Sequence, residues 1–282
     1  MDLMKVPRGD KSISQFARAN CYELSGRTLE LVMDDGYDIV LMPEDGACAW
    51  RRAGGEEGRA AAMCFKADDS TYLLTFDVSE RENHSYALDF EQRLVTRVVC
   101  RKGVHPANYH IMQCAFTFGA IRVRGYKLPY KRHTFTGEHL GTTVKWRWSP
   151  EMFTLHAYLQ SSWYRITWDD EGRAAEDFGD TNETLPSTDE HAAYVKIKDR
   201  MFLFAVTEET EERLLGDTQI FRCDNLLLLQ NYDRMIQVGR GFGDAQSPDR
   251  TKLRHIFVPL AAFGSPVELP ERFLNADNPY TV

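Results

Sequence analysis

Short alternating segments separated by turn residues run through most of this sequence, and they restrict the chain to an all-β fold. Asp35-Gly36 and Asp45-Gly46 each join two such segments, and an Asp-Gly pair in that position is the strongest short-range signal for a β-hairpin. Many short strands with turns about every 8–12 residues are typical of a sandwich or an up-and-down barrel. The first half contains strand candidates at residues 28–33, 37–42, 47–50, 61–65, 71–76, 85–90 and 94–100.

Residues 140–172 form the segment that is densest in aromatic side chains. Three strand-like runs, 143–148, 153–158 and 163–168, are rich in β-branched and aromatic residues. Aromatic and polar side chains on neighbouring hairpin strands are typical of a pocket wall. The alternative is that the aromatic rings only fill a core. Four of the five tryptophans lie here: Trp146, Trp148, Trp163 and Trp168.

The second half of the chain repeats the order of strands and turns of the first half. A basic linker at residues 127–139 separates the two halves. A barrel of about eight strands encloses side chains or one small ligand. We therefore predict two consecutive antiparallel β-barrels, at residues 26–126 and 140–282, preceded by a leader at residues 1–25 that packs against the body.

The composition argues against several classes of partner. The 282-residue chain has a net charge of -8 and a pI of about 5.5, whereas duplex nucleic acid and anionic membrane surfaces attract basic proteins. No apolar run approaches the roughly 18 residues of a membrane helix, and the N-terminus lacks a signal-peptide pattern. The six cysteines include no C-x-x-C pair, which favours reduced core thiols. We expect a cytoplasmic protein that binds neither nucleic acid nor membrane.

Sequence motifs for common cofactors are absent. The chain contains no G-x-x-x-x-G-K-[ST], no H-E-x-x-H and no G-x-S-x-G. Residues 238–245 read VGRGFGDA, but no βαβ pattern surrounds them, so we expect a loop that closes the second barrel and not a dinucleotide site. The histidines are not clustered as metal ligands are. We therefore predict no cofactor and no metal.

A family resemblance covers nearly the full chain. The first half resembles the N-terminal domain of the molybdenum cofactor biosynthesis protein F (MoaF-like) family through Gly26-Arg27-Thr28, Asp34-Asp35-Gly36 and the strand at 71–77. The resemblance implies two consecutive lipocalin-like, or calycin-like, barrels. It departs at Gln160, where asparagine is expected, and at residues 165–168, so a substrate is not carried over. The second half resembles the family through His133, Leu140-Gly141, Trp146, Ser149-Pro150, His156, Tyr158-Leu159, Ser161 and Tyr164.

A candidate site lies on the aromatic strands of the second half. His156 and Tyr158 are two residues apart on one predicted strand, so their side chains share a face. We predict that His156, Tyr158 and Arg165 are catalytic, because imidazole, phenol and guanidinium together move protons and hold a carboxylate or phenolate. The alternative is that His156 is a hydrogen-bonded core residue and Arg165 is paired outside. The predicted ligand-binding residues are Trp146, Tyr164, Trp168, Arg222 and His255.

Three functional hypotheses follow. The first is an enzyme that converts a small apolar or aromatic metabolite by cofactor-free acid/base chemistry, as a lyase, isomerase or cyclase. The second is a carrier or sensor of such a molecule, and the third is a structural module that forms a homodimer through strand edges. The charge runs Arg51-Arg52 and Glu80–Glu82 are expected to face water, so we expect the first barrel to be the more structural of the two.

The expected absence of a metal is directly testable. Chelation followed by dialysis should leave the thermal midpoint of unfolding unchanged, because only a ligand bound to the folded state raises it. The measurement is differential scanning fluorimetry before and after treatment. A loss of several degrees that a divalent ion restores would contradict the prediction.

Overall fold

The structure is a computed structural model, and every regular element in its described part is a β-strand. The chain divides into two compact units, residues 18–135 with 195–203, and residues 1–17 with 136–194 and 204–282. The expectation of an all-β fold with two consecutive antiparallel barrels is confirmed. The structure describes residues 14–17, 21–103, 112–150, 152–160, 163–168, 187–207, 221–246 and 252–268.

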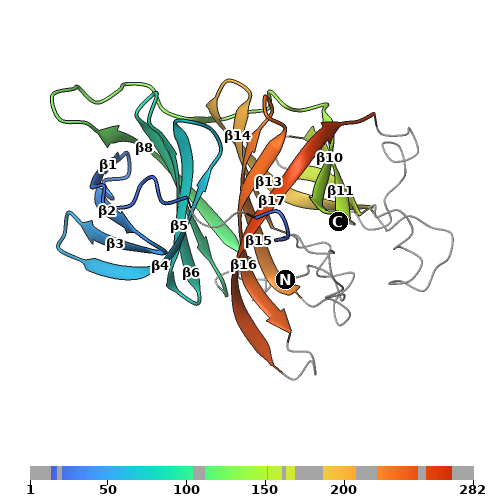
Figure 1. Ribbon diagram of the computed structural model, residues 1–282, viewed down its shortest axis with the longest axis horizontal. Coiled ribbons are helices and arrows are strands. Elements are labelled where there is room, and N and C mark those ends of the chain that lie inside the picture. Colours follow the sequence, from blue (N-terminus) through green and yellow to red (C-terminus); the bar gives the residue numbers. More distant parts are fainter. Residues whose placement is uncertain are drawn as a thin grey trace. The chain divides into compact units, whose positions relative to one another are not determined.

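The first barrel is a closed ring of eight strands in chain order (Figure 1). Each strand pairs antiparallel with the next, and β1 pairs with β8 through Leu31 and Ile121 to close the ring. Up-and-down order of this kind follows from short hairpins between alternating segments. The strands are β1 (Leu29–Met33), β2 (Ile39–Glu44), β3 (Ala47–Arg52), β4 (Glu57–Lys66), β5 (Thr71–Ser79), β6 (Glu82–Asp89), β7 (Leu94–Arg101) and β8 (Gln113–Arg122).

The second barrel is built from β10 to β17, again in chain order. β10 pairs with β17, and β12 pairs with β13 through Arg165 and Asp189, so these eight strands also form a ring. The short strand β9 (Thr134–Phe135) pairs with the far end of β13. The remaining strands are β10 (Thr143–Ser149), β11 (Met152–Gln160), β12 (Trp163–Trp168), β13 (Ser187–Lys198), β14 (Met201–Thr207), β15 (Phe221–Asn231), β16 (Ile236–Gln246) and β17 (Leu253–Pro266).

Two Asp-Gly turns set the first hairpins as the sequence predicts. Gly36 and Gly46 have positive φ angles of 76° and 73°, a conformation that glycine adopts without steric cost. Gly36 donates its amide hydrogen to the carbonyl of Met33 at 3.0 Å. The Gly36 turn places Asp35 and Tyr37 at one end of the first barrel, the end that also carries the β3–β4 and β5–β6 turns, and the Gly46 turn lies at the opposite end.

The opposite end of the first barrel is covered by the segment before β1. Leu24 is 1% exposed and belongs to the barrel core. The amide of Cys21 donates to the carbonyl of Cys64 at 2.8 Å, and Lys66 and Tyr72 both bind the carboxylate of Glu23.

The glycine-rich residues 238–245 are a strand and not the loop predicted from the sequence. They lie within β16, which pairs along its length with β15 and β17. Glycine inside a strand marks a place where another backbone approaches closely. A Cβ on Gly239 would overlap the carbonyl oxygen of Leu227, so the glycines serve packing between strands.

This packing generates a paired test. Gly239→Ala should lower the free energy of unfolding by about 3 kcal/mol, the upper part of the range for overpacking, because the overlapping atom is backbone and cannot rotate away. Gly241→Ala, on the same face of β16, would meet Val258 Cγ2 at 3.2 Å and should cost about 1 kcal/mol or less. Urea denaturation of both variants measures the difference, and equal stability would contradict the packing argument.

Candidate functional site

The inner face of the first barrel carries polar side chains among its core residues. Directly paired residues of antiparallel strands point to the same face. Leu74, Tyr86, Arg97 and Thr117 are paired in succession across β5, β6, β7 and β8. Leu74 and Tyr86 belong to the buried core, so Arg97 also points into the barrel. The adjacent row of paired residues is Phe76, His84 and Val99.

Arg97 is an inward-facing cation whose hydrogen-bonding capacity is only partly used. Its residue is 7% exposed, and its Nη2 donates to the carboxylate of Asp35 at 2.8 Å. Its Nε and Nη1 are buried and have no hydrogen-bond partner among the residues that the structure describes. A buried donor without an acceptor costs about 1–3 kcal/mol. Arg97 therefore keeps two nitrogen donors inside the barrel without an acceptor among the described residues.

The ring of Tyr37 brings a second cation to the same end of the barrel. The guanidinium carbons of Arg52 and Arg97 lie 3.7 and 3.9 Å from the Tyr37 ring centroid, which are cation–π distances. Arg52 also donates to Glu56 at 2.6 Å and keeps 36% of its side chain exposed. Arg52 thus packs on an aromatic ring while its ion pair with Glu56 stays exposed to water. Each guanidinium group is thus paired with a carboxylate, Arg97 with Asp35 and Arg52 with Glu56, and packs on the same ring.

Tyr86 supplies a neutral donor beside Arg97. Its residue is 0% exposed, and its hydroxyl oxygen has no hydrogen-bond partner within the described ranges. Its ring stacks on Phe76 with centroids 5.9 Å apart. Burial raises the pKa of Tyr86 far above its usual value, so the hydroxyl keeps its proton at neutral pH. The group can donate a hydrogen bond to a bound oxygen.

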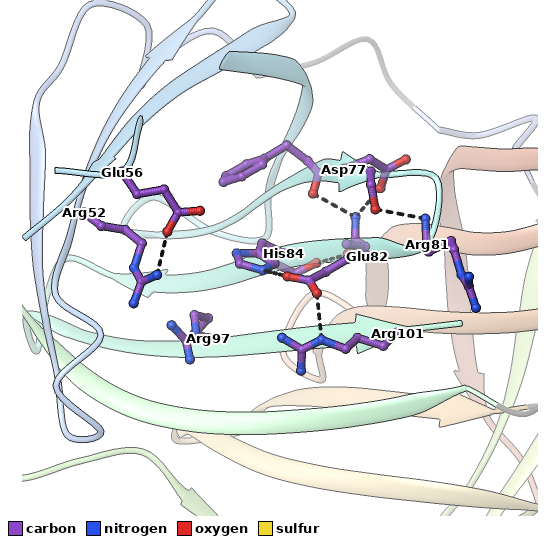
Figure 2. A network of polar contacts seen from close by, with 12 residues as sticks. Arg52, Glu56, Asp77, Arg81, Glu82, His84, Arg97 and Arg101 are labelled. Carbon is purple, nitrogen blue, oxygen red and sulfur yellow. Dashed lines mark hydrogen bonds and ion pairs between the residues drawn. The ribbon is translucent and has the colours of Figure 1, made fainter. Parts of the chain in front are cut away.

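His84 and Glu82 form a hydrogen-bonded pair on β6 (Figure 2). His84 Nε2 lies 2.7 Å from Glu82 Oε1, and Arg101 Nε donates to Glu82 Oε2 at 2.7 Å. Burial lowers the pKa of His84 against the opposing effect of Glu82. Burial raises the pKa of Glu82, but the hydrogen bonds from Arg101 and His84 outweigh it, so this pKa is lowered overall. At neutral pH the pair is a neutral imidazole and a carboxylate. We call Tyr37, Arg52, Glu82, His84, Tyr86 and Arg97 the Arg97 site.

In the second barrel the predicted residues His156, Tyr158 and Trp146 lie together in the core. All three are fully or almost fully buried. Trp146 Nε1 and Gln230 Nε2 donate to the Tyr158 hydroxyl oxygen at 3.1 and 2.7 Å. His156 lies between two hydroxyls, with Nε2 2.9 Å from Thr154 Oγ1 and Nδ1 3.4 Å from the Tyr158 oxygen.

Donor counting assigns the protons of this network. Two donors on the Tyr158 oxygen leave its own hydrogen for His156 Nδ1, so the imidazole carries its proton on Nε2 and donates to Thr154. Burial lowers the pKa of His156 to about 3 and raises that of Tyr158 well above its usual value. His156 and Tyr158 are therefore both neutral, and their hydrogen bonds join them to other core residues. The catalytic role of His156 and Tyr158 stays a prediction.

The other predicted site residues are placed by strand register. On β12, Arg165 pairs with Ala157 and Trp168 with Thr154, and Tyr164 pairs with Glu190 of β13. The side chains of Tyr164, Arg165, Trp168 and Arg222 lie outside the described part of the structure. His255 is half-buried, with Nδ1 3.2 Å from the carbonyl oxygen of Gly243 and its ring edge-on to Phe242. Both Arg222 and His255 pair with Asp244 of β16.

Sequence reasoning missed the Arg97 site. The signal was present in residues 94–100, LVTRVVC, where one arginine stands at an inward position of an apolar strand. Charged residues are almost never fully buried unless they are paired. A single arginine at an inward position of an apolar strand is therefore a stronger indication of function than the charge runs Arg51-Arg52 and Glu80–Glu82.

The described residues contain neither a metal-binding cluster nor a membrane-spanning helix. No group of three or more histidine, cysteine, aspartate or glutamate side chains there has an arrangement that would hold a metal ion. No helix in the same part of the chain is long and apolar enough to cross a membrane.

Comparison with protein families gives a match within the first half of the chain. Residues 10–102 match the family model of the MoaF N-terminal domain. The solved structure "Crystal Structure of a putative beta-lactamase from Burkholderia vietnamiensis" is similar with 14% identity and a TM-score of 0.29, covering 36% of this chain and 94% of that chain. A search of curated proteins found no match.

The buried state of His156 predicts acid sensitivity. The folded pKa of about 3 lies below the unfolded value of about 6.5, so the unfolded state binds a proton first and stability falls as the pH drops below 6.5. At pH 5 this term should remove about 2 kcal/mol from the free energy of unfolding relative to pH 8. His156→Gln should lose this term. Urea denaturation at both pH values tests it, and an unchanged pH dependence in the variant would contradict the prediction.

Proposed function

We propose, from the premise that residues 10–102 are MoaF-like, that the first barrel binds a small, partly aromatic molecule that carries an anionic oxygen group. The observation that supports this proposal best is Arg97, which is buried inside a closed barrel with two nitrogen donors that no described residue engages. An eight-stranded barrel has room for side chains or one small ligand. Binding of this kind suits either an enzyme or a carrier or sensor.

The chemistry of the Arg97 site defines what would be recognised. Tyr86 on β6 and Arg97 on β7 are register partners in the sheet. The Tyr86 hydroxyl and the Arg97 guanidinium therefore lie on the same face of the sheet, inside the barrel. A carboxylate or phenolate oxygen accepts charge-assisted hydrogen bonds from such donors. The rings of Tyr37, Phe76 and Tyr86 supply planar apolar area for an aromatic group.

A site in the second barrel is the alternative suggested by its aromatic strands. There, the polar atoms of Trp146, His156 and Tyr158 are hydrogen bonded to other core groups. A ligand that bound to them would have to replace those contacts, and a displaced buried polar group is costly. Buried polar atoms without a partner among the described residues occur in the second barrel too, at Gln230 Oε1 and Gln237 Nε2, but these belong to neutral amides, whereas the first barrel leaves two nitrogens of the Arg97 guanidinium without one. An anionic ligand binds more strongly to a charged donor than to a neutral one, and this difference favours the first barrel.

Binding of a simple probe tests the proposal. Phenylacetate should bind to the wild-type protein, and the uncharged phenylacetamide should bind at least about tenfold more weakly, because it lacks the charge that Arg97 and Arg52 favour. Arg97→Gln should weaken phenylacetate binding by about 10- to 100-fold, the effect of losing a hydrogen bond between charged groups. Isothermal titration calorimetry gives both affinities.

Two further variants separate binding from folding. Arg59→Gln is the matched control, since Arg59 belongs to the same barrel but is exposed and pairs with Glu44. Tyr86→Phe should weaken binding without lowering the thermal midpoint, because it removes a buried hydroxyl that has no partner among described residues. Equal affinity for both probes, or no effect of Arg97→Gln, would disprove the proposed site.

A further inference from the structure

We infer that His84, positioned by Glu82, is the general base of the Arg97 site, and that the substrate class is an aryl-substituted 2-oxo acid whose acidic C–H proton is transferred to His84. This inference rests on the proposed function, because it requires that the first barrel binds an aromatic anion. It goes further in assigning a reaction, proton transfer from carbon, to a pair of residues.

The contacts of His84 determine where its basic nitrogen lies. The Glu82 carboxylate can only accept hydrogen bonds, so the proton of the neutral imidazole resides on Nε2, 2.7 Å from Glu82 Oε1. Nδ1 then carries the lone pair. Within the described chain, Nδ1 makes no hydrogen bond. A base that is oriented by a carboxylate through one nitrogen and open at the other is the arrangement used in acid/base catalysis.

The second requirement is a group that stabilises the negative charge formed on oxygen. Tyr86 lies two residues from His84 on the same strand, so both side chains share the inner face. Arg97 is paired with Tyr86 and is diagonal to His84, which is paired with Val99. Diagonal neighbours across antiparallel strands lie within reach of long side chains. His84, Tyr86 and Arg97 therefore occupy neighbouring positions of the inner face, as the inferred reaction requires.

The reaction balances without a further reactant. His84 Nδ1 takes the proton from the carbon beside the carbonyl, and the C–H electron pair forms the C=C bond of an enolate. The carbonyl π electrons move to oxygen, where hydrogen bonds from Tyr86 and Arg97 stabilise the charge. The imidazolium, stabilised by Glu82, returns the proton to oxygen, which gives the enol, or to carbon, which gives back the keto acid.

Phenylpyruvate is the probe for this step. In deuterium oxide, the wild-type protein should accelerate exchange of its benzylic hydrogens over buffer alone, measured by proton NMR. His84→Gln should reduce the acceleration by about 10² to 10⁴-fold, the usual effect of losing a general base. The same variant should bind phenylacetate with an affinity within about threefold of wild type. His191→Gln, an exposed histidine on β13, is the matched control and should exchange at the wild-type rate.

Glu82 is a positioning residue, and its test is a pH profile. Exchange is lost when His84 becomes protonated. Glu82 favours the imidazolium, whereas burial, Arg97 and Arg101 oppose it. Without the carboxylate, protonation needs a lower pH, so Glu82→Gln should move the acidic limb of the profile to lower pH as well as slowing exchange. A purely structural Glu82 would leave the position of the limb unchanged.

The outcomes separate the two proposals. Phenylacetate binding without accelerated exchange of phenylpyruvate would overturn the role of His84 and leave the binding proposal intact. Failure to bind phenylacetate would overturn the proposed function. Exchange that survives His84→Gln but is abolished by His156→Ala would place the chemistry in the second barrel and overturn the inference.

Discussion

A closed eight-stranded ring divides its side chains into an inner and an outer set, and any charge in the inner set has to be matched within the barrel. The first barrel carries such a charge on Arg97, one row away from His84. Asp35 meets only one nitrogen of that guanidinium. Other polar groups surround Arg97. Tyr37 packs between Arg97 and Arg52 at the same end of the barrel, and Tyr86 pairs with Arg97 in the same row of inward-facing residues.

The two barrels treat buried polar groups differently. The second barrel satisfies Tyr158 with Trp146 and Gln230, and burial holds the pKa of His156 near 3. Such a network is neutral and stabilises one packing arrangement. Each barrel also buries an arginine: Arg240 of the second barrel donates to Asn225, whereas Nε and Nη1 of Arg97 in the first barrel have no partner among the described residues. Buried polar groups are common to both barrels, and the unpartnered guanidinium nitrogens of Arg97 distinguish the first.

Much of the fold could be predicted from the sequence, because its signals are local. The Asp-Gly turns at Gly36 and Gly46 fixed the first hairpins, and alternating segments marked most strands. The glycines at 238–245 misled the prediction, since a glycine that allows close strand packing looks the same in sequence as one that allows a loop. The site was harder to predict, because the environments of Arg97 and His84 depend on residues from several strands that only the closed ring brings together.

The pairing of Tyr86 with Arg97 has a consequence for how the gene of such a protein can vary. Side chains along a strand alternate with a period of two, so the insertion or deletion of one codon inside β7 would turn Arg97 outward while leaving the composition almost unchanged. Length changes in the turn at Glu80 and Arg81 would leave that phase intact. Related sequences that retain the site should therefore keep the lengths of the two paired segments, residues 82–89 and 94–101, unchanged. Insertions and deletions should occur outside these segments, even where the residues themselves differ.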